Sequence, residues 1–206
     1  GYPGNLEVQV IYTLNNNDEL SVKYEAVTDK TTIINLTQHS YFNLSADFNK
    51  NILDHDILIN ADSFLPVDST LIPTGEIRNV GDTPFDFRRP KNVGDEISNS
   101  NKQLMIGNGY DHCWVLNNQN QGLRFVASAY DSETGRLLEV FSDQPGIQFY
   151  SGNFLDGTLQ SKIGGTYDFR SGFCLETQHY PNSPNEKSFP SVTLSSGEKY
   201  VTETIF

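Results

Sequence analysis

Apolar and polar residues alternate with a period of two along much of this sequence, a pattern that favours β-strands with one buried face. In the segment 6–14, LEVQVIYTL, every even position is apolar or aromatic, so we expect a strand with one side in a core. The run 15–18, NNND, is typical of a turn. The alternation resumes over 20–26, and the two segments together predict a β-hairpin.

Two further hairpins are expected nearer the C-terminus. The segments 123–129 and 136–142 flank the turn-rich residues 131–135, and the segments 192–194 and 200–206 flank residues 195–198. No stretch keeps helical spacing over three turns with a capping signal. Residues 64–106 are rich in Pro, Gly, Asp and Asn, so we expect long loops with short strands there.

Antiparallel hairpins in series without helices predict an all-β sandwich or barrel. A chain of 206 residues is long enough for one large β domain, and 36% of its residues are hydrophobic, which is enough for a sizeable core. We therefore expect a single β domain over residues 1–206.

Charge and cysteine content narrow the class of protein. The chain has 14 Lys and Arg against 26 Asp and Glu, a net charge of −12 that repels nucleic acid and anionic lipid. No apolar run is long enough to span a bilayer, and no segment is typical of a signal peptide. The two cysteines, Cys113 and Cys174, argue against a disulfide framework and against a Cys-based zinc site.

Four segments concentrate polar and reactive side chains where strands or strand ends are expected. They are 35–44 (NLTQHSYFNL), 109–114 (GYDHCW), 146–153 (GIQFYSGN) and 174–181 (CLETQHYP). In the last segment, Leu175 and Thr177 share one strand face with Phe173, and Cys174 and Glu176 share the other. If the first face is core, Glu176 stands where a carboxylate is costly without partners. A solvated strand Glu is the commoner alternative.

The other candidates also have simpler explanations. His39 falls near the end of an expected strand over 33–39, where a hydrogen-bonded structural His is the commoner alternative. The aromatic and amide side chains at 41–43 favour a sugar site. Asp111 follows a tight turn, and it either binds sugar hydroxyls or caps that turn. The cluster 54–56, DHD, has loop-like flanks and is expected on the solvated surface, with weak metal binding as the lesser alternative.

The sequence lacks a phosphate-cradling Gly loop, a His-Glu-x-x-His helix and a Gly-x-Ser-x-Gly elbow. One proton donor and one acceptor are nevertheless sufficient to open a sugar ring. The base removes the proton of the anomeric hydroxyl, the acid protonates the ring oxygen, and rotation about C1–C2 precedes reclosure. Each group contributes about 10²–10⁴-fold to the rate.

Taken in order, the four polar segments strongly resemble those of the aldose 1-epimerases, also called galactose mutarotases. Three further stretches fit the family pattern: GYPGNLEV at 1–8, LIPTGEI at 71–77 and TPFDF at 83–87. The resemblance runs over essentially the whole chain. It implies a large antiparallel β-sandwich of the galactose mutarotase-like type, and an isomerase that interconverts the α and β anomers of free aldohexoses such as galactose and glucose.

The resemblance also implies roles for six residues: His39 as general acid, Glu176 as general base, Asp111 and Gln148 as ligands of sugar hydroxyls, and Ser40 and Tyr41 as lining of the same pocket. The family requires no organic cofactor, and we expect no metal ligand among these residues; calcium, bound by some bacterial members, stays open. The expected partner is an aldohexose. We expect a monomer or weak homodimer in the cytoplasm, with a periplasmic or secreted location as the alternative.

The chain departs from the family pattern at its start. Family members carry a segment before the GYPG motif, with a second histidine and an arginine that help to bind the sugar, and this chain begins at that motif. The missing strands belong to the same sandwich, so we expect unpaired edges and exposed apolar faces. We also expect the acid–base pair to be retained and most of the sugar affinity to be lost.

Three alternatives stay open. A glycoside hydrolase would pair Asp111 with Glu176 and release reducing sugar. A sugar-binding protein or non-catalytic fragment would keep its affinity when Glu176 is replaced by Gln. An epimerase of hexose 6-phosphates would need basic residues for the phosphate, and the one tight basic pair, Arg88–Arg89, is expected to be a loop feature.

Overall fold

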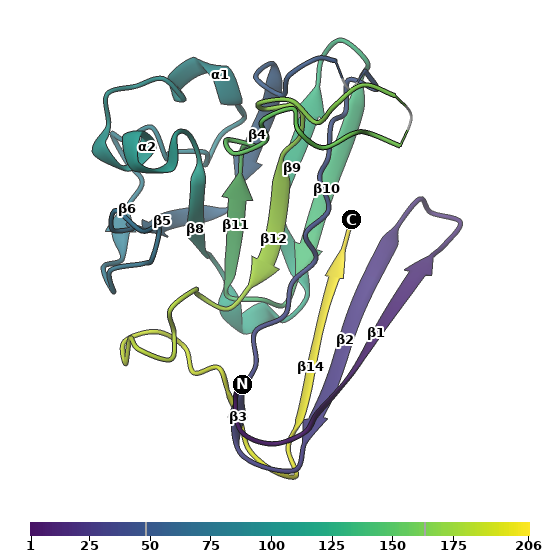
Figure 1. Cartoon of the computed structure of the whole chain (residues 1–206), viewed down its shortest axis with the longest axis vertical. Helices are drawn as coiled ribbons and strands as arrows, with labels where there is room; N and C mark the ends of the chain where they lie inside the picture. The colour runs from purple at the N-terminus through teal and green to yellow at the C-terminus, as the bar shows by residue number, and fades with distance from the viewer. Residues whose placement is uncertain (48, 163) are drawn as a thin grey trace.

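The computed structural model describes residues 1–47, 49–162 and 164–206 (Figure 1). Its strands are β1 (Leu6–Leu14), β2 (Leu20–Thr28), β3 (Thr32–Ile33), β4 (His55–Ile59), β5 (Ala61–Leu65), β6 (Arg78–Asn79), β7 (Lys91–Asn92), β8 (Asp111–Leu116), β9 (Arg124–Asp131), β10 (Arg136–Ser142), β11 (Gly146–Tyr150), β12 (Cys174–Gln178), β13 (Thr193–Leu194) and β14 (Lys199–Ile205). The helices are α1 (Val93–Glu96), α2 (Lys102–Gly107) and a 3₁₀ turn at Gln119–Gln121. Over these ranges, no helix has the length and apolar character needed to cross a membrane.

The named strands pair antiparallel and form two large sheets. One sheet has the order β1-β2-β14-β10-β9-β4-β7, the other has the order β12-β11-β8-β5-β6, and β13 pairs with β3 in a small third sheet. The main hydrophobic core takes buried residues from both large sheets, among them Ile57 and Ala129 of the first and Ile147 and Leu175 of the second. The all-β sandwich expected from the hairpins is confirmed.

Aromatic residues fill the centre of this core. Trp114 of β8 is fully buried, and its indole N–H donates a hydrogen bond of 3.0 Å to the carbonyl of Phe85. The rings of Phe64 and Phe85 stack with their centroids 4.2 Å apart. Burial of each such side chain stabilises the fold by roughly 1.5–3 kcal/mol. The loop around Phe85 therefore packs against the core face of the five-stranded sheet. The polar residues of the candidate site lie on the opposite face of that sheet, on β8, β11 and β12.

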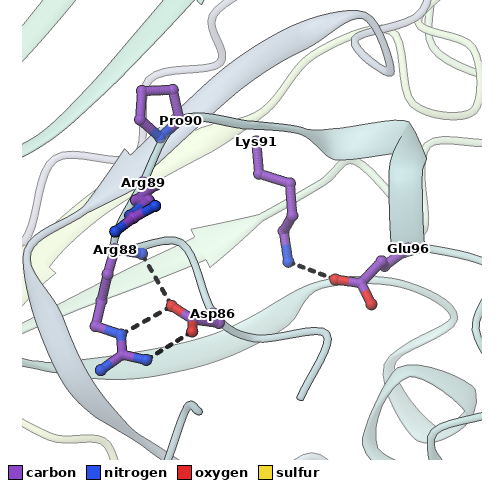
Figure 2. Close-up of a pocket in the computed structure, with 6 residues that line it drawn as sticks. All are labelled: Asp86, Arg88, Arg89, Pro90, Lys91 and Glu96. Carbon is purple, nitrogen blue, oxygen red and sulfur yellow. Dashed lines mark hydrogen bonds and ion pairs between the residues drawn. The ribbon is translucent and has the colours of Figure 1, made fainter. Parts of the chain in front are cut away.

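Residues 64–106 form long loops with short strands, as expected, and add the two short helices. This segment carries a polar depression of about 710 Å³, drawn in Figure 2 and lined by Asp86, Arg88, Arg89, Pro90, Lys91 and Glu96. Arg88 donates to the carboxylate of Asp86 at 2.9 and 2.7 Å, and Lys91 donates to Glu96 at 2.7 Å. Of the three basic groups, Arg88 and Lys91 are thus neutralised by carboxylates. This disfavours a phosphate site and supports the view of the pair 88–89 as a loop feature.

The first hairpin is confirmed, but the prediction of a buried face on β1 is wrong. β1 pairs with β2 along its whole length, from Leu6 opposite Thr28 to Leu14 opposite Leu20. It is the edge strand of its sheet, and all nine of its residues are exposed. In Figure 1, β1 and β2 extend away from the five-stranded sheet. The exposed apolar side chains expected for this chain are therefore found on β1.

The hairpin over 123–142 is confirmed as β9 and β10, whereas the hairpin over 192–206 is wrong. β13 pairs with β3, and β14 lies between β2 and β10. Alternation located both C-terminal strands correctly. It did not reveal their partners, because residues far away in the sequence provide them.

The cluster 54–56 was expected on a solvated loop, and this prediction is wrong for its histidine. His55 begins β4 and is 1% exposed. Its Nε2 accepts a hydrogen bond of 2.9 Å from the backbone N–H of Leu44, and its ring packs edge-on against Phe173. Because His55, Ile57 and Ile59 alternate on one face of β4, the histidine is buried with the core residues.

Candidate active site

The candidate site is built on three adjacent strands, β12, β11 and β8. Their register places Glu176 opposite Gln148 and Gln148 opposite Cys113 in one row. A second row aligns Cys174, Tyr150 and Asp111. Directly opposed residues of antiparallel strands point to the same face, so these side chains lie together. All six residues come from three of the four polar segments, 109–114, 146–153 and 174–181.

The face assignment of β12 made from the sequence is confirmed. Leu175 and Thr177 are almost fully buried, and Leu175 belongs to the main core. Glu176 is therefore on the opposite face, yet it is only 8% exposed as a residue. The solvated-Glu alternative is wrong, because other parts of the chain cover this face of the sheet.

His39 reaches this face from a segment without regular structure. It was expected near a strand end, but β3 ends at Ile33, so this detail is wrong. Two sets of hydrogen bonds hold the segment along β12. Asn35 exchanges side-chain bonds of 2.9 Å with the backbone of His179, and Phe42 exchanges backbone bonds of 2.8 and 2.9 Å with Phe173. Because Phe173 and His179 flank β12, the two attachments place His39 over the strand.

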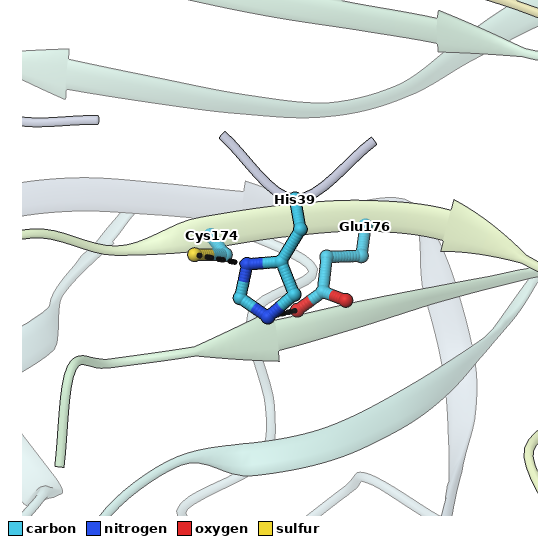
Figure 3. Close-up of side chains that lie close together, drawn as sticks. All are labelled: His39, Cys174 and Glu176. Atoms are coloured by element: carbon cyan, nitrogen blue, oxygen red, sulfur yellow. Dashed lines mark hydrogen bonds and ion pairs between the residues drawn. The ribbon is translucent and has the colours of Figure 1, made fainter. Parts of the chain in front are cut away.

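Figure 3 shows the imidazole of His39 between Cys174 and Glu176. Its Nε2 lies 3.5 Å from Oε1 of Glu176, and its Nδ1 lies 3.4 Å from Sγ of Cys174. The His39 side chain is 52% exposed and the Glu176 side chain only 10%. A solvent-accessible proton donor thus faces a buried carboxylate on one side of the sheet.

Burial, foremost, raises the pKa of Glu176 to about 7. The neighbouring His39 lowers this pKa and the charge of Asp111 raises it further, both by smaller amounts. A carboxylate with such a pKa is a stronger base than an ordinary glutamate and is still partly ionised at neutral pH. Its environment therefore suits it to accept a proton from a hydroxyl group.

Asp111 of β8 and Gln148 of β11 form a hydrogen-bonded polar pair beside the acid–base pair. The amide N–H of Gln148 donates a hydrogen bond of 2.8 Å to Oδ1 of Asp111. Burial raises the pKa of Asp111. The Gln148 Oε1 is buried and has no hydrogen-bond partner among the described residues. Leaving such an acceptor unpaired costs about 1–3 kcal/mol, and a sugar hydroxyl would satisfy it.

The two pocket residues expected beside His39 are placed differently. The ring of Tyr41 lies 5.2 Å from the His39 ring and meets Tyr150 edge-on at 6.1 Å, so Tyr41 borders the site. The hydroxyl of Ser40 instead accepts a hydrogen bond of 2.8 Å from the Gln38 side chain. The structure therefore joins Tyr41 to the cluster by ring contacts and turns the Ser40 hydroxyl toward its own segment.

Sequence reasoning did not assign roles to Cys174 and Tyr150. Both carry a usable signal, because each stands two positions from a site residue on the same strand, Cys174 from Glu176 and Tyr150 from Gln148. Residues two apart on a strand share a face. Tyr150 is held in place by its hydroxyl, which accepts a hydrogen bond of 2.8 Å from the backbone N–H of Phe154.

The whole chain is similar to known proteins. The sequence model of the family described as aldose 1-epimerase matches residues 1–206. The chain belongs to the aldose 1-epimerase family. Galactose mutarotase from Sus scrofa is 50% identical over 206 residues, and aldose 1-epimerase from Escherichia coli K12 is 36% identical over 206 residues. The match to the first covers 100% of this chain and the match to the second 99%.

Solved structures of the aldose 1-epimerase family share this fold. A GalM/aldose epimerase homologue from C. elegans superposes with a TM-score of 0.88 and 29% identity, covering 100% of this chain and 60% of that one. Galactose 1-epimerase from Lactobacillus acidophilus gives a TM-score of 0.84 with 33% identity, covering 99% and 57%. The chain spans 58% of the length of the Sus scrofa mutarotase and 59% of the E. coli epimerase.

Proposed function

We propose that this protein interconverts the α and β anomers of free aldohexoses, such as galactose and glucose, by acid–base opening and reclosure of the sugar ring. The observation that carries the proposal is the pair His39 and Glu176, with Nε2 and Oε1 3.5 Å apart on the polar face of β12. Membership of the aldose 1-epimerase family supports it.

In the proposed reaction, the Glu176 carboxylate removes the proton of the anomeric hydroxyl while protonated His39 gives its Nε2 proton to the ring oxygen. The electrons of the broken O–H bond form the C1 carbonyl, and those of the C1–O5 bond go to the ring oxygen. Rotation about C1–C2 then presents the other carbonyl face. Each group contributes about 10²–10⁴-fold, provided that it is positioned against its oxygen.

Ring closure runs the same proton transfers in reverse. The imidazole takes back the proton of the O5 hydroxyl, and the Glu176 carboxyl returns its proton to the carbonyl oxygen. Both residues finish in their starting states, so the cycle needs no net proton exchange with solvent. This balance explains why a single acid and a single base are sufficient and why we propose that no cofactor takes part.

We assign sugar binding to the polar pair Asp111 and Gln148, beside His39 and Glu176. Asp111 holds the Gln148 amide at 2.8 Å and thereby orients Gln148, whose buried Oε1 is free to accept a hydroxyl proton. Tyr41 offers an aromatic face at the rim, since its side chain is about half exposed and packs against His39. Rings of this kind suit the apolar faces of sugars. Ser40 is proposed as a minor part of the same lining.

Polarimetry on freshly dissolved α-D-galactose and α-D-glucose tests the proposal. We expect the protein to speed the approach to anomeric equilibrium, and His39→Asn and Glu176→Gln each to slow it by about 10²–10⁴-fold. Glu133→Gln is the matched control, because Glu133 is exposed and forms a surface ion pair with Lys50 at 2.6 Å. A parent rate equal to that of buffer alone, or a fully active Glu176→Gln protein, refutes the proposal.

The same samples separate the other candidate functions. A glycoside hydrolase would release reducing sugar from a galactoside, which an epimerase leaves intact. A sugar-binding protein would not speed anomerisation in its parent form, and its Glu176→Gln variant would retain its affinity for galactose. We expect neither result.

We further infer a cytoplasmic protein that acts as a monomer or weak homodimer. Both Cys113 and Cys174 are free and buried, as is usual for proteins of a reducing compartment. Sedimentation at several concentrations tests the assembly state, and a stable higher oligomer would contradict it. Calcium is not needed for the proposed proton transfers, so added chelator should leave the rate unchanged.

A further inference from the structure

Three different donor atoms converge at the candidate site. The imidazole of His39, the thiol of Cys174 and the carboxylate of Glu176 each offer one atom, and these atoms all lie within 4.8 Å of one another. The measured separations are 3.4 Å from Nδ1 to Sγ and 3.5 Å from Nε2 to Oε1. No assigned role in the proposed reaction uses the thiol, so its presence beside the acid–base pair calls for an explanation.

Each of the two measured separations matches the distance between neighbouring ligands of a tetrahedral transition-metal ion. Zinc bonds of about 2.3 Å to sulfur and about 2.0–2.2 Å to nitrogen and oxygen place neighbouring ligands roughly 3.4–3.6 Å apart. A single ring nitrogen has to serve the metal, so the imidazole must turn slightly. Its side chain is 52% exposed, which leaves it room to do so. Cys174 and Glu176 stand two residues apart on β12, so their side chains already point to the same face.

We propose that His39, Cys174 and Glu176 form a binding site for a thiophilic divalent transition-metal ion, such as Zn²⁺, that reversibly blocks the site. The donor set of one nitrogen, one sulfur and one oxygen suits zinc and disfavours calcium or magnesium, which prefer oxygen alone. The three protein ligands leave a fourth position for water. From the sequence, we expect no metal ligand among the site residues, and Cys174 is the additional donor that the fold supplies.

Charge also favours the metal. Glu176 and, once deprotonated, Cys174 each place a negative charge on a largely buried face, and a carboxylate or thiolate there is costly without a partner. A divalent cation compensates both charges. Binding releases the thiol proton to solvent as the metal–sulfur bond forms. Asp111 is close enough to act on both groups electrostatically and adds to the negative potential.

Among the described residues, the side chains around His55 do not bring three ligand atoms together as those at His39 do. His55 lies near Asp54 and Asp131 around a cavity of about 290 Å³. Its Nε2 accepts the Leu44 N–H at 2.9 Å, its Nδ1 is buried, and Asp131 accepts from Thr134 at 2.6 and 2.9 Å. Within the described parts of the chain, the backbone makes no hydrogen bond to the three ligand atoms at His39.

The consequence for catalysis rests on the proposed function. A metal bound to the His39 nitrogen and the Glu176 oxygen occupies the lone pairs that proton transfer needs. Zinc should therefore inhibit anomerisation, and galactose should compete with it. A chelator should restore the rate, which separates occupancy of this site from aggregation.

Metal binding can be measured without any sugar reaction. Co²⁺ alone, titrated into the full chain, should produce a thiolate-to-cobalt charge-transfer band that Zn²⁺ then abolishes. Cys174→Ser should remove the band and raise the Kd for Zn²⁺ by calorimetry at least about tenfold, while Cys113→Ser should retain both. His39→Asn, on the exposed side of the cluster, tests the same site if Cys174→Ser fails to fold.

The outcomes distinguish the two proposals. No charge-transfer band with the parent protein, or equal zinc affinity for the parent and both the Cys174→Ser and His39→Asn proteins, overturns the metal site even if anomerisation is observed. A band that depends on Cys174, in a protein that does not speed anomerisation, supports the metal site and refutes the epimerase activity.

Discussion

Replacement of Glu176 by Gln should stabilise the fold at alkaline pH while it removes the proposed base. The Glu176 side chain is 10% exposed, and burial is the main reason why its pKa rises to about 7. The folded protein therefore holds this proton more tightly than the unfolded chain does. Gln has nearly the same shape as Glu and carries no charge at any pH.

The magnitude follows from the two pKa values. The group moves from 4.5 to about 7, and each unit of pKa corresponds to about 1.4 kcal/mol. The ionised carboxylate thus costs the fold at most about 3 kcal/mol. Because the folded pKa is the higher one, this cost is absent below the unfolded value. It grows as the pH rises between the two values and is complete above the folded pKa.

Urea unfolding of the parent and Glu176→Gln proteins at about pH 5 and about pH 9 measures the effect. The stability advantage of the variant should grow by about 2–3 kcal/mol between these conditions. Asp111 and the other titrating groups are present in both proteins, so their contributions largely cancel. The exposed-site control Glu133→Gln should show no such growth. An advantage independent of pH, or a more stable parent at alkaline pH, would show that partners compensate the carboxylate.

Two further changes test the positioning of His39 and the exposure of β1. Asn35→Ala removes both hydrogen bonds to the His179 backbone. It should lower kcat for galactose by about 10²-fold in the folded protein, because small displacements of a catalytic group have effects of that size. An unchanged kcat would contradict the role of Asn35 in positioning His39. Val22 on β2 is fully buried, so Val22→Ala should lower the free energy of unfolding by about 2 kcal/mol. Val10 lies on exposed β1, so Val10→Ala should change it by less than about 0.5 kcal/mol. Equal losses of stability in urea unfolding would show that β1 is covered in solution.

Local alternation was a sound guide to strands and faces. It located β1, β2, β9 and β10 and placed Leu175 toward the core, with Glu176 opposite it. The side chains of neighbouring strand residues must point to opposite sides, and only one side can be apolar and buried. This rule needs no information beyond the strand itself.

The same rule failed where distant segments decide the outcome. The alternation of β1 predicts a buried face, but burial requires another layer, and the described residues leave that strand exposed. Likewise, β13 and β14 alternate correctly yet pair with β3 and with β2 and β10. His55 appeared to be part of a surface cluster until β4 placed it beside Phe173.

The roles of the site residues came from resemblance, and their meeting came from tertiary structure. The sequence by itself determined that this chain is an antiparallel β protein with Glu176 on the face of its strand opposite the core. Only the fold brought His39 to that carboxylate, through hydrogen bonds at both ends of β12. It thereby placed the His39 ring between Glu176 and Cys174. The physical reason is that periodicity fixes the direction of a side chain within its own strand. The groups that it faces are set by contacts between segments far apart in the chain.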